Sequence, residues 1–512
     1  MLRPLKKTSF IKDFLLCFLS GLLIALSFPD FNLEFFAWIG FVPVFFALKD
    51  KSKSRSFLLS YFCGIVFWSA TVYWLIHVTL LGTILLVLYL SLYFGLFGFL
   101  LSTINYRPST LRILLIPSVW VLLEYCRSHF LTGFPWALLG YSQYLNLPII
   151  QIADIAGVWL VSFLVMTINA AVYSAIADSS KLPVRIIRLS LVVLCLAIAF
   201  FYGSFKLKQI SKAKSRGALK VSVVQANIPQ ELKWQPQARD FIMKKYLEVS
   251  RKAAKEKPDL MIWPEASIPE VLGQDPPYYE IAAKFSKENA VFLLLGAVTV
   301  RDGTYFNSAL LISPDGQADK IYDKLHLVPF GEYIPLKNVF RFLETVVPIG
   351  DIAAGKDYVV FDGPGLKGPI HSIQPRFGVL VCFEDVFPEL AREFVKKGAG
   401  FLVNITNDGW YKKTSAAAQH FQASVFRAVE NRVFLVRCAN TGISGFVAPS
   451  GQIISTVEDA LGENIFIEGF KTETIDPRFK FFSFYTRSGD FFILLCLIFA
   501  LYGTIAPLFK KR

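Results

Sequence analysis

Gly-Val-Leu-Val-Cys-Phe-Glu-Asp, at residues 378–385, is a short apolar run that stops at a thiol and two acidic side chains. A run of this length and composition predicts a buried strand with polar residues at its end. Similar runs recur at Leu219–Val224, Leu260–Trp263, Val291–Val300, Ala309–Ser313, Phe401–Ile405 and Val433–Val436. Polar helical stretches lie between several of them, for example at Ala238–Lys255 and Glu280–Asn289. Strands that alternate with helices predict an α/β layered domain over residues 219–470.

Outside that domain the sequence is typical of a membrane protein. Of its 512 residues, 54% are hydrophobic and only 18% are charged, whereas ordinary soluble domains hold about 25% charged residues. No Asp, Glu, Lys or Arg occurs between Ser56 and Tyr106. A single helix over that stretch would be far longer than the ~30 Å core of a bilayer. The chain is therefore expected to fold back once, near Thr79–Gly82.

The apolar runs predict a polytopic α-helical membrane domain with about eight spans. Seven spans precede the polar domain, at about 12–28, 33–47, two within 56–106, 111–126, 149–177 and 186–205, and the eighth covers about 491–508. The predicted organisation begins with the seven-span region at 1–205 and a linker at 206–218. The α/β domain at 219–470 follows, then a second linker at 471–489 and a last helix with a basic tail at 490–512.

Basic residues predict the orientation of the spans. The net charge is +14, and in so apolar a chain a basic excess indicates anionic lipid and topology signals rather than nucleic acid. The short basic loops and both basic ends fall on one side, so both termini are expected in the cytoplasm. The Lys206–Arg216 cluster disagrees, but long domains cross largely regardless of charge. A weak cleavage pattern at Ala25–Ser27 is not expected to be used, because removing the first span would reverse the topology.

Three polar constellations follow predicted strands. Glu265 comes after Leu260–Ile262, where partial desolvation would raise its pKa toward that of a general base. Lys324 offers a fixed positive charge, and Glu332 can orient it. Cys382 ends a strand, where a chain reversal can expose the thiol and aim backbone N–H groups at a substrate oxygen. A strand-end cysteine alone is usually a small buried hydrophobe, but the three together form a base, a cation and a nucleophile for acyl transfer.

Other catalytic signatures are missing from the sequence. It has no G-x-S-x-G, no H-E-x-x-H and no P-loop, so a serine hydrolase, a zinc site and a P-loop nucleotide site are not expected. Basic residues do not alternate with aromatic residues in the manner of a nucleic-acid module. Seven cysteines are too few for a disulfide scaffold of this length. We therefore expect neither metal nor cofactor.

Several motifs together resemble a known family. Trp-Pro-Glu-Ala-Ser at 263–267, Asp-Lys-Leu-His-Leu-Val-Pro-Phe-Gly-Glu-Tyr at 323–333 and Cys-Phe-Glu at 382–384 resemble the Glu-Lys-Cys triad of the carbon–nitrogen hydrolase (nitrilase) superfamily. Further stretches resemble its membrane-embedded branch, the apolipoprotein N-acyltransferases, at 133–136, 140–143, 225–227, 233–234, 407–410 and 439–442. Phe383 departs from that branch, where many members have Tyr.

The resemblance implies an αββα sandwich attached to an eight-helix domain of a bacterial inner membrane, with the sandwich in the periplasm. It implies acyl transfer from a phospholipid to the α-amine of a diacylglyceryl-cysteine on an apolipoprotein, through a Cys382 thioester. Glu265 would be the base, Lys324 would stabilise the oxyanion, and Glu332 and Glu384 would support them. Substrate-binding candidates are Trp136, Trp234, Asn307 and Trp410. The enzyme is expected to need no cofactor and to be monomeric.

Two alternatives stay open from the residues themselves. A membrane-tethered amidase or nitrilase would use the same three residues with water as the acceptor. A transporter with a soluble regulatory domain would place ionisable groups along its path, and Glu124 and Asp154 lie within predicted spans. Local pairing of those two carboxylates would argue against the transporter.

Overall fold

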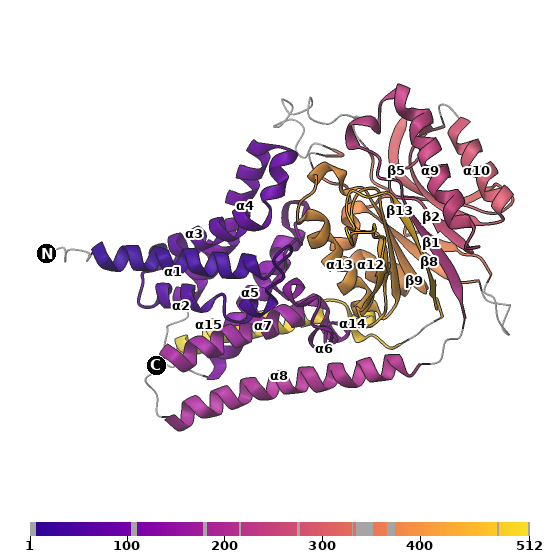
Figure 1. The fold of residues 1–512 in the computed structure, drawn as a ribbon. Helices are drawn as coiled ribbons and strands as arrows, with labels where there is room; N and C mark the ends of the chain where they lie inside the picture. The colour runs from indigo at the N-terminus through magenta and orange to yellow at the C-terminus, as the bar shows by residue number, and fades with distance from the viewer. Residues whose placement is uncertain are drawn as a thin grey trace. The chain divides into compact units, whose positions relative to one another are not determined.

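The computed structural model describes residues 7–103, 110–177, 182–213, 217–273, 277–329, 331–333, 352–365, 374–478 and 481–509. The chain forms two compact units, one of residues 1–208 with 488–512 and the other of residues 209–487 (Figure 1). The second unit therefore begins before and ends after the α/β domain expected at 219–470. We describe each unit by itself.

The first unit is helical. Its α-helices are α1 (Lys7–Leu26), α2 (Val42–Leu48), α3 (Lys53–Thr71), α4 (Leu80–Thr103), α5 (Thr110–His129), α6 (Leu147–Ile150), α7 (Ala153–Ala177), α8 (Leu182–Ser211) and α15 (Phe491–Phe509). Short 3-10 helices connect them: η1 (Glu34–Trp38), η2 (Tyr73–His77), η3 (Phe130–Thr132) and η4 (Leu139–Gln143). The uncharged stretch is broken between α3 and α4, next to the expected turn.

Three of the described helices are long and apolar enough to cross a membrane: α4, α7 and the part of α8 from Val192 to Ser211. The other expected spans stay predictions. The apolar run at 33–47 is not one continuous helix, because η1 ends at Trp38 and α2 begins only at Val42. A β-carbon on Gly40, between them, would lie 2.8 Å from the Ile24 side chain, so only glycine allows this close approach to α1.

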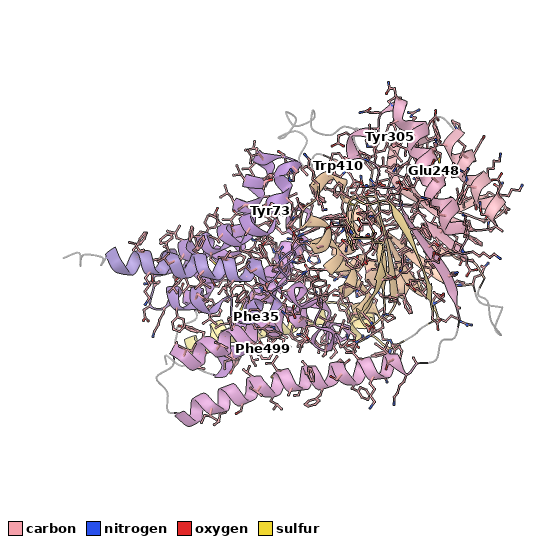
Figure 2. All side chains as sticks on the ribbon, in the orientation of Figure 1. Phe35, Tyr73, Glu248, Tyr305, Trp410 and Phe499 are labelled. Atoms are coloured by element: carbon pink, nitrogen blue, oxygen red, sulfur yellow. The ribbon has the colours of Figure 1, made fainter. Side chains whose placement is uncertain are left out.

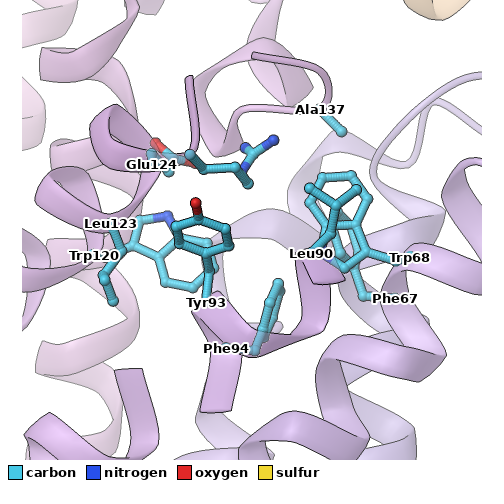
Figure 3. A pocket seen from close by; sticks show the side chains of 10 residues that line it. Phe67, Trp68, Leu90, Tyr93, Phe94, Trp120, Leu123, Glu124 and Ala137 are labelled. Carbon is cyan, nitrogen blue, oxygen red and sulfur yellow. The ribbon is translucent and has the colours of Figure 1, made fainter. Parts of the chain in front are cut away.

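Ionisable groups inside the helical unit have local partners. Figure 3 shows a pocket where Glu124 and Tyr93 place polar ends among aromatic rings, including those of Trp68 and Trp120. Glu124 Oε1 accepts a hydrogen bond from the backbone N–H of Leu139 at 2.7 Å. Its carboxylate therefore fixes the start of η4 to α5.

Asp154 has partners within the same unit. Its Oδ1 accepts a hydrogen bond from the Tyr202 hydroxyl at 2.7 Å, and its Oδ2 lies 3.5 Å from Lys206 Nζ. Both partners are on α8. This local pairing, like that of Glu124, is typical of structural groups and does not favour a transport path.

The second unit contains two β-sheets. The seven-stranded sheet has the order β13-β1-β2-β4-β5-β6, with β3 also paired to β4. Its strands are β1 (Leu219–Gln225), β2 (Leu260–Ile262), β3 (Val271–Leu272), β4 (Phe292–Arg301), β5 (Thr304–Ile312), β6 (Ala318–Asp323) and β13 (Gly469–Ile475). The six-stranded sheet has the order β12-β11-β10-β9-β8-β7. Its strands are β7 (Val360–Asp362), β8 (Arg376–Val381), β9 (Phe401–Thr406), β10 (Phe434–Ala439), β11 (Gly445–Val447) and β12 (Ile453–Thr456).

The sheets pack face to face and helices cover their outer faces (Figure 1). Strand β1 contacts β10 and β5 contacts β8 across the interface. Helices α9 (Arg239–Ala254) and α10 (Pro277–Asn289) contribute to the core outside the first sheet. Helices α12 (Pro388–Lys396) and α13 (Ala416–Asn431) contact the second sheet. This is the expected αββα sandwich. A short helix, α14 (Phe484–Ser488), follows β13.

The strand directions gather polar loops at one edge of each sheet. Strands β1, β2 and β4 are parallel neighbours, and so are β8, β9 and β10. Because parallel strands end on the same side of a sheet, the residues that follow β2, β8, β9 and β10 come together there. Glu265 follows β2 and Cys382 follows β8.

Candidate active site

Cys382 occupies a strained turn at the end of β8. Its φ is +53°, in the left-handed region that few residues other than glycine adopt. The 3-10 helix η8 (Cys382–Val386) begins at this residue, so the chain reverses direction at the thiol. The Asn404 side-chain amide donates to the backbone oxygen of Cys382 at 3.1 Å and to that of Leu380 at 3.0 Å. Strand β9 thereby holds the turn in place.

Glu265 is placed by a second tight turn. The next residue, Ala266, has a φ of +47°, and the turn lies directly against β4. A β-carbon on Gly296 of β4 would lie 2.7 Å from the Glu265 α-carbon, so glycine is required at that contact. Ser267 N–H donates to Gly296 O at 2.8 Å. The carboxylate side chain of Glu265 is almost fully buried, with the residue 8% exposed.

Lys324 follows β6 and is paired with Glu332. Its ammonium nitrogen lies 3.0 Å from Glu332 Oε1 and 2.8 Å from Oε2, and 4.0 Å from Glu265 Oε1. The pKa of Lys324 is raised: burial lowers it, but the charges of Glu332, Cys382 and Glu265 more than offset that effect. The ammonium is therefore held charged beside Glu265.

Asn307 connects the two glutamates instead of facing outward. Its side-chain Nδ2 donates to Glu265 Oε1 at 2.7 Å and to Glu332 Oε1 at 2.8 Å. The residue lies on β5 and is 8% exposed. Both amide hydrogens thus hold the carboxylates in place, and the predicted contact of Asn307 with substrate stays a prediction.

Glu384 ties the lysine loop to the cysteine turn. Its Oε1 accepts from the backbone N–H of Leu325 at 2.6 Å and its Oε2 from that of Val381 at 2.7 Å. The Tyr322 hydroxyl is 2.9 Å from both oxygens. Burial raises the pKa of Glu384 to about 7, and these hydrogen bonds oppose the rise. The geometry fits the supporting role expected for this residue.

The half-buried Cys382 thiol lies within electrostatic reach of the other two catalytic candidates. Its pKa is raised, chiefly by burial and then by the negative charge of Glu265, whereas Lys324 lowers it. A thiol with a raised pKa needs a base to become nucleophilic, and Glu265 is the carboxylate beside it. The structure thus brings Glu265, Lys324 and Cys382 together. Phe383 contacts Phe387, with 5.1 Å between the ring centroids, so an apolar ring follows the nucleophile.

Behind the thiol lies a buried charge cluster that sequence reasoning missed. His420 of α13 lies between two carboxylates, with Nε2 2.7 Å from Asp385 Oδ1 and Nδ1 2.9 Å from Asp408 Oδ1. Arg437 of β10 is 3.0 Å from Asp385 Oδ2 and 3.0 Å from Asp408 Oδ2. It also donates to the Asn404 Oδ1 at 2.5 Å. The cluster thus supports the asparagine that holds the Cys382 turn.

Charge balance accounts for the cluster. Burial acts to raise the pKa of Asp408, but His420 and Arg437 outweigh it and leave that pKa lowered to about 2. The pKa of His420 is raised, because Asp385 and Asp408 together outweigh the opposite effects of burial and Arg437. Two cations therefore face two carboxylates. No short motif signals this arrangement, since the four residues are far apart in sequence.

Replacing Asp408 by Asn is expected to lower the free energy of unfolding by about 3–5 kcal/mol, because it leaves buried positive charge uncompensated. The native pKa of Asp408 is below its unfolded value of about 3.9. Its stabilisation is therefore present above that pH and is lost as the pH falls toward about 2. Thermal unfolding of the full-length protein between pH 7 and pH 3 measures both effects.

Glu248→Gln is the matched control for Asp408→Asn. Glu248 is on the surface of α9 (Figure 2), its side chain 47% exposed and 4.0 Å from Lys244 Nζ. Such exposed pairs contribute about 0.3–0.5 kcal/mol. Equal losses of stability in the two variants would contradict a balanced cluster.

The tryptophan candidates divide into two groups. Trp136 is 3% exposed and packs on Trp74, with 5.1 Å between the ring centroids. Its ring therefore packs inside the helical unit, and the expected contact with substrate stays a prediction. Trp234 is half-buried and Trp410, on η9 (Asp408–Tyr411), is 42% exposed (Figure 2).

Tyr411, which follows Trp410, was not predicted as a site residue. Burial raises the pKa of its hydroxyl, and the charges of Cys382, Asp408 and Glu265 add to the rise. Tyr411 is therefore within electrostatic range of Cys382 and Glu265. The η9 turn therefore lies next to the reacting groups.

Comparisons with known proteins agree with this geometry. The carbon-nitrogen hydrolase family model matches residues 220–477, and the apolipoprotein N-acyltransferase N-terminal domain model matches residues 20–171. An apolipoprotein N-acyltransferase of Geobacter metallireducens is 37% identical over 95% of this chain and 93% of its own length. The chain belongs to the apolipoprotein N-acyltransferase family. A second member, from Chlorobaculum tepidum, is 29% identical over 86% of this chain and 87% of its own length.

As a member of the apolipoprotein N-acyltransferase family, this protein is an enzyme. The resemblance seen in the motifs is confirmed. The crystal structure of Saccharomyces cerevisiae Nit3, of branch 10 of the nitrilase superfamily, aligns with 52% of this chain and 93% of its own, at 19% identity and a TM-score of 0.39. The region that the carbon-nitrogen hydrolase model matches, residues 220–477, lies within the α/β unit.

Proposed function

We propose that this enzyme moves an acyl chain from a membrane phospholipid to the α-amine of an N-terminal diacylglyceryl-cysteine on an apolipoprotein, through a thioester on Cys382. The observation that carries the proposal is the strained thiol at the end of β8, within electrostatic reach of Glu265 and Lys324. A thiol of raised pKa beside a carboxylate and a paired ammonium fits nucleophilic catalysis assisted by a base.

In the first half-reaction Glu265 takes the thiol proton and the Cys382 sulfur attacks an ester carbonyl of the phospholipid. Negative charge develops on the carbonyl oxygen, where Lys324 and the backbone N–H that follows Cys382 stabilise it. The ester C–O bond breaks, and the proton held by Glu265 passes to the leaving alkoxide. The products are a lysophospholipid and the Cys382 thioester.

In the second half-reaction the α-amine of the diacylglyceryl-cysteine attacks the thioester carbonyl. Glu265 accepts a proton from the amine, the C–S bond breaks, and the proton returns to the Cys382 sulfur. An amide is formed and the free thiol is restored. Amines attack thioesters more readily than oxygen esters, which gives the covalent intermediate its purpose. A hydrolase with water as acceptor would use the same first half, but the family favours the lipoprotein amine.

Both substrates carry long acyl chains, which accounts for the joining of this catalytic unit to apolar helices. We place the helical unit in a bacterial inner membrane as a multi-pass domain, with both termini in the cytoplasm and the catalytic unit in the periplasm. Trp234 and Trp410 are the tryptophans we retain as lipid-contact candidates, because the first is half-buried and the second exposed. The protein acts as a monomer in this proposal.

Mass spectrometry of the purified protein after incubation with phospholipid tests the proposed function. A mass increase equal to one acyl chain, removed by hydroxylamine and located on the Cys382 peptide, is expected. A synthetic diacylglyceryl-cysteine peptide should then discharge the adduct and gain the same acyl chain. An adduct on another residue, or discharge to water alone, would contradict the proposal.

The proposed orientation predicts a labelling pattern. On a background with the exposed Cys126 and Cys195 and the half-buried Cys382 replaced by serine, a cysteine introduced at Lys252 should react in intact cells, once the outer membrane is permeabilised, with a thiol reagent that cannot cross the inner membrane. A cysteine introduced at Lys53 should react only after the cells are lysed. Both positions are exposed, so access alone separates them. The reverse pattern would contradict a periplasmic catalytic unit.

A further inference from the structure

A second lysine is buried in the active site. Lys233 follows the 3-10 helix η5 (Gln230–Leu232) and is 3% exposed. Its ammonium nitrogen donates to the backbone oxygen of Glu265 at 2.8 Å. A buried ammonium is ordinarily paired with a carboxylate, whereas the partner found here is a neutral carbonyl. Such a costly arrangement indicates a functional charge.

Hydrogen bonds fix the segment that carries Lys233. The Ile228 N–H donates to Asn440 Oδ1 at 2.9 Å, and Asn440 Nδ2 donates back to Ile228 O at 2.8 Å. Asn407 Nδ2 donates to Gln230 Oε1 at 2.6 Å. Asn407 and Asn440 follow β9 and β10, so the segment is tied to the same sheet edge as Cys382. These hydrogen bonds therefore hold Lys233 at the active site.

The lysine acts on the turn that carries the base. Glu265 precedes Ala266, whose φ is +47°, and the carbonyl of Glu265 needs a donor because the turn is buried. Lys233 supplies that donor. Its charge interacts with Glu265 and with Cys382, and burial, the larger effect, lowers the pKa of Lys233 to about 8. Asp408 is balanced by His420 and Arg437, which leaves Lys324 facing the two carboxylates of Glu265 and Glu332. Lys233 is a second cation against that pair.

We propose that Lys233 is a positioning residue of the acyl-transfer site, which holds the Glu265 turn through its carbonyl and supplies a second positive charge beside Cys382. The inference rests on the proposed roles of Glu265 and Cys382. The positive charges of Lys233 and Lys324 together stabilise the Cys382 thiolate as it forms. The hydrogen bond from Lys233 keeps the Glu265 carboxyl group, which has taken the proton, in a fixed position.

The test compares Lys233→Met with the wild type in the full-length protein. Iodoacetamide alkylation of the Cys382 peptide at pH 7 is followed by mass spectrometry, because only the thiolate reacts and Lys233 is charged at that pH. Loss of the charge should lower the alkylation rate about tenfold, and should slow acyl-enzyme formation from phospholipid at least tenfold (~1.4 kcal/mol). Lys244→Met, on the exposed face of α9 with its side chain 76% exposed, should match the wild type.

Lys233→Gln is the second neutral variant, which retains an amide donor for the Glu265 carbonyl. It should show the same fall in alkylation rate with a smaller loss of acyl-enzyme formation. An unchanged alkylation rate in either folded neutral variant would overturn the proposal, and so would failure of both to fold, which would assign Lys233 to stability. If the wild type formed no acyl adduct at all, the proposed function would fail while the alkylation rates still decided the role of Lys233.

Discussion

Cys382→Ala is expected to abolish the acyl-enzyme and all transfer to the lipoprotein amine. The variant keeps the backbone of the turn but lacks the atom that forms the thioester, so no slower route through the same intermediate exists. Alanine tolerates the φ of +53° about as well as cysteine does, and the Asn404 contact is to the backbone. We expect the thermal midpoint to stay within a few degrees of the wild type. Incubation with phospholipid followed by mass spectrometry measures the adduct.

Cys438→Ala is the matched control, because Cys438 is the other cysteine of the α/β unit. It is fully buried between the sheets, where its thiol donates to Val224 O at 3.4 Å and to Ile262 O at 3.2 Å. Burial raises the pKa of the Cys438 thiol. The thiol therefore stays protonated at neutral pH and does not react. Removing it should cost some stability and leave acylation of Cys382 intact. A phospholipid-derived thioester in the Cys382→Ala protein would contradict our assignment of the nucleophile.

Lys324→Ala should slow acyl-enzyme formation by about 10²–10³-fold or more, the typical loss when one donor to an oxyanion is removed. It also leaves Glu332 without the ammonium at 2.8 Å. Lys324→Arg should be poor as well, because a planar guanidinium cannot take the place of a compact ammonium between two carboxylates. Single-turnover kinetics with a fluorescent phospholipid measure the step.

Lys320→Ala, on the same strand β6, provides the comparison for Lys324. Its ammonium nitrogen is 2.6 Å from Asp362 Oδ2, and both side chains are 44% exposed, so little change in rate is expected. Near-normal turnover in Lys324→Arg would show that only the charge, and not its placement, matters there.

The strands of the α/β unit could be predicted where they are central and apolar. The runs at Leu219–Val224 and Phe401–Ile405 differ from β1 and β9 by one residue at the end. The predicted end of the domain, at residue 470, cuts through strand β13, whose sequence, Gly-Phe-Lys-Thr-Glu-Thr-Ile, is polar. It is an edge strand that pairs only with β1, and an edge strand can leave polar side chains in solvent. Composition therefore did not reveal it.

The reacting groups could be predicted because each follows a recognisable strand within a short motif. Two supports, Glu332 and Glu384, lie in the same motifs and could be predicted as well, but the charge cluster could not, since distant segments supply it. The fold brings Arg437 and His420 next to Asp385 and Asp408. From the sequence alone, a charged residue is expected at the surface unless its buried partner is known. Trp136 shows the opposite error: a tryptophan in a Gly-Pro loop suggests an interface, yet this ring is buried against Trp74.

The pairing of β1 with β13 joins the two ends of the catalytic unit. Leu219 is opposite Ile475 in this antiparallel pair, so the first strand of the sandwich begins about 5 Å, the spacing of neighbouring strands, from the point where its last strand ends. A domain with adjacent ends can be inserted into, or excised from, a host loop without stretching the host. The start of β1 and the end of β13 are therefore the natural junction at which to graft the sandwich of a relative.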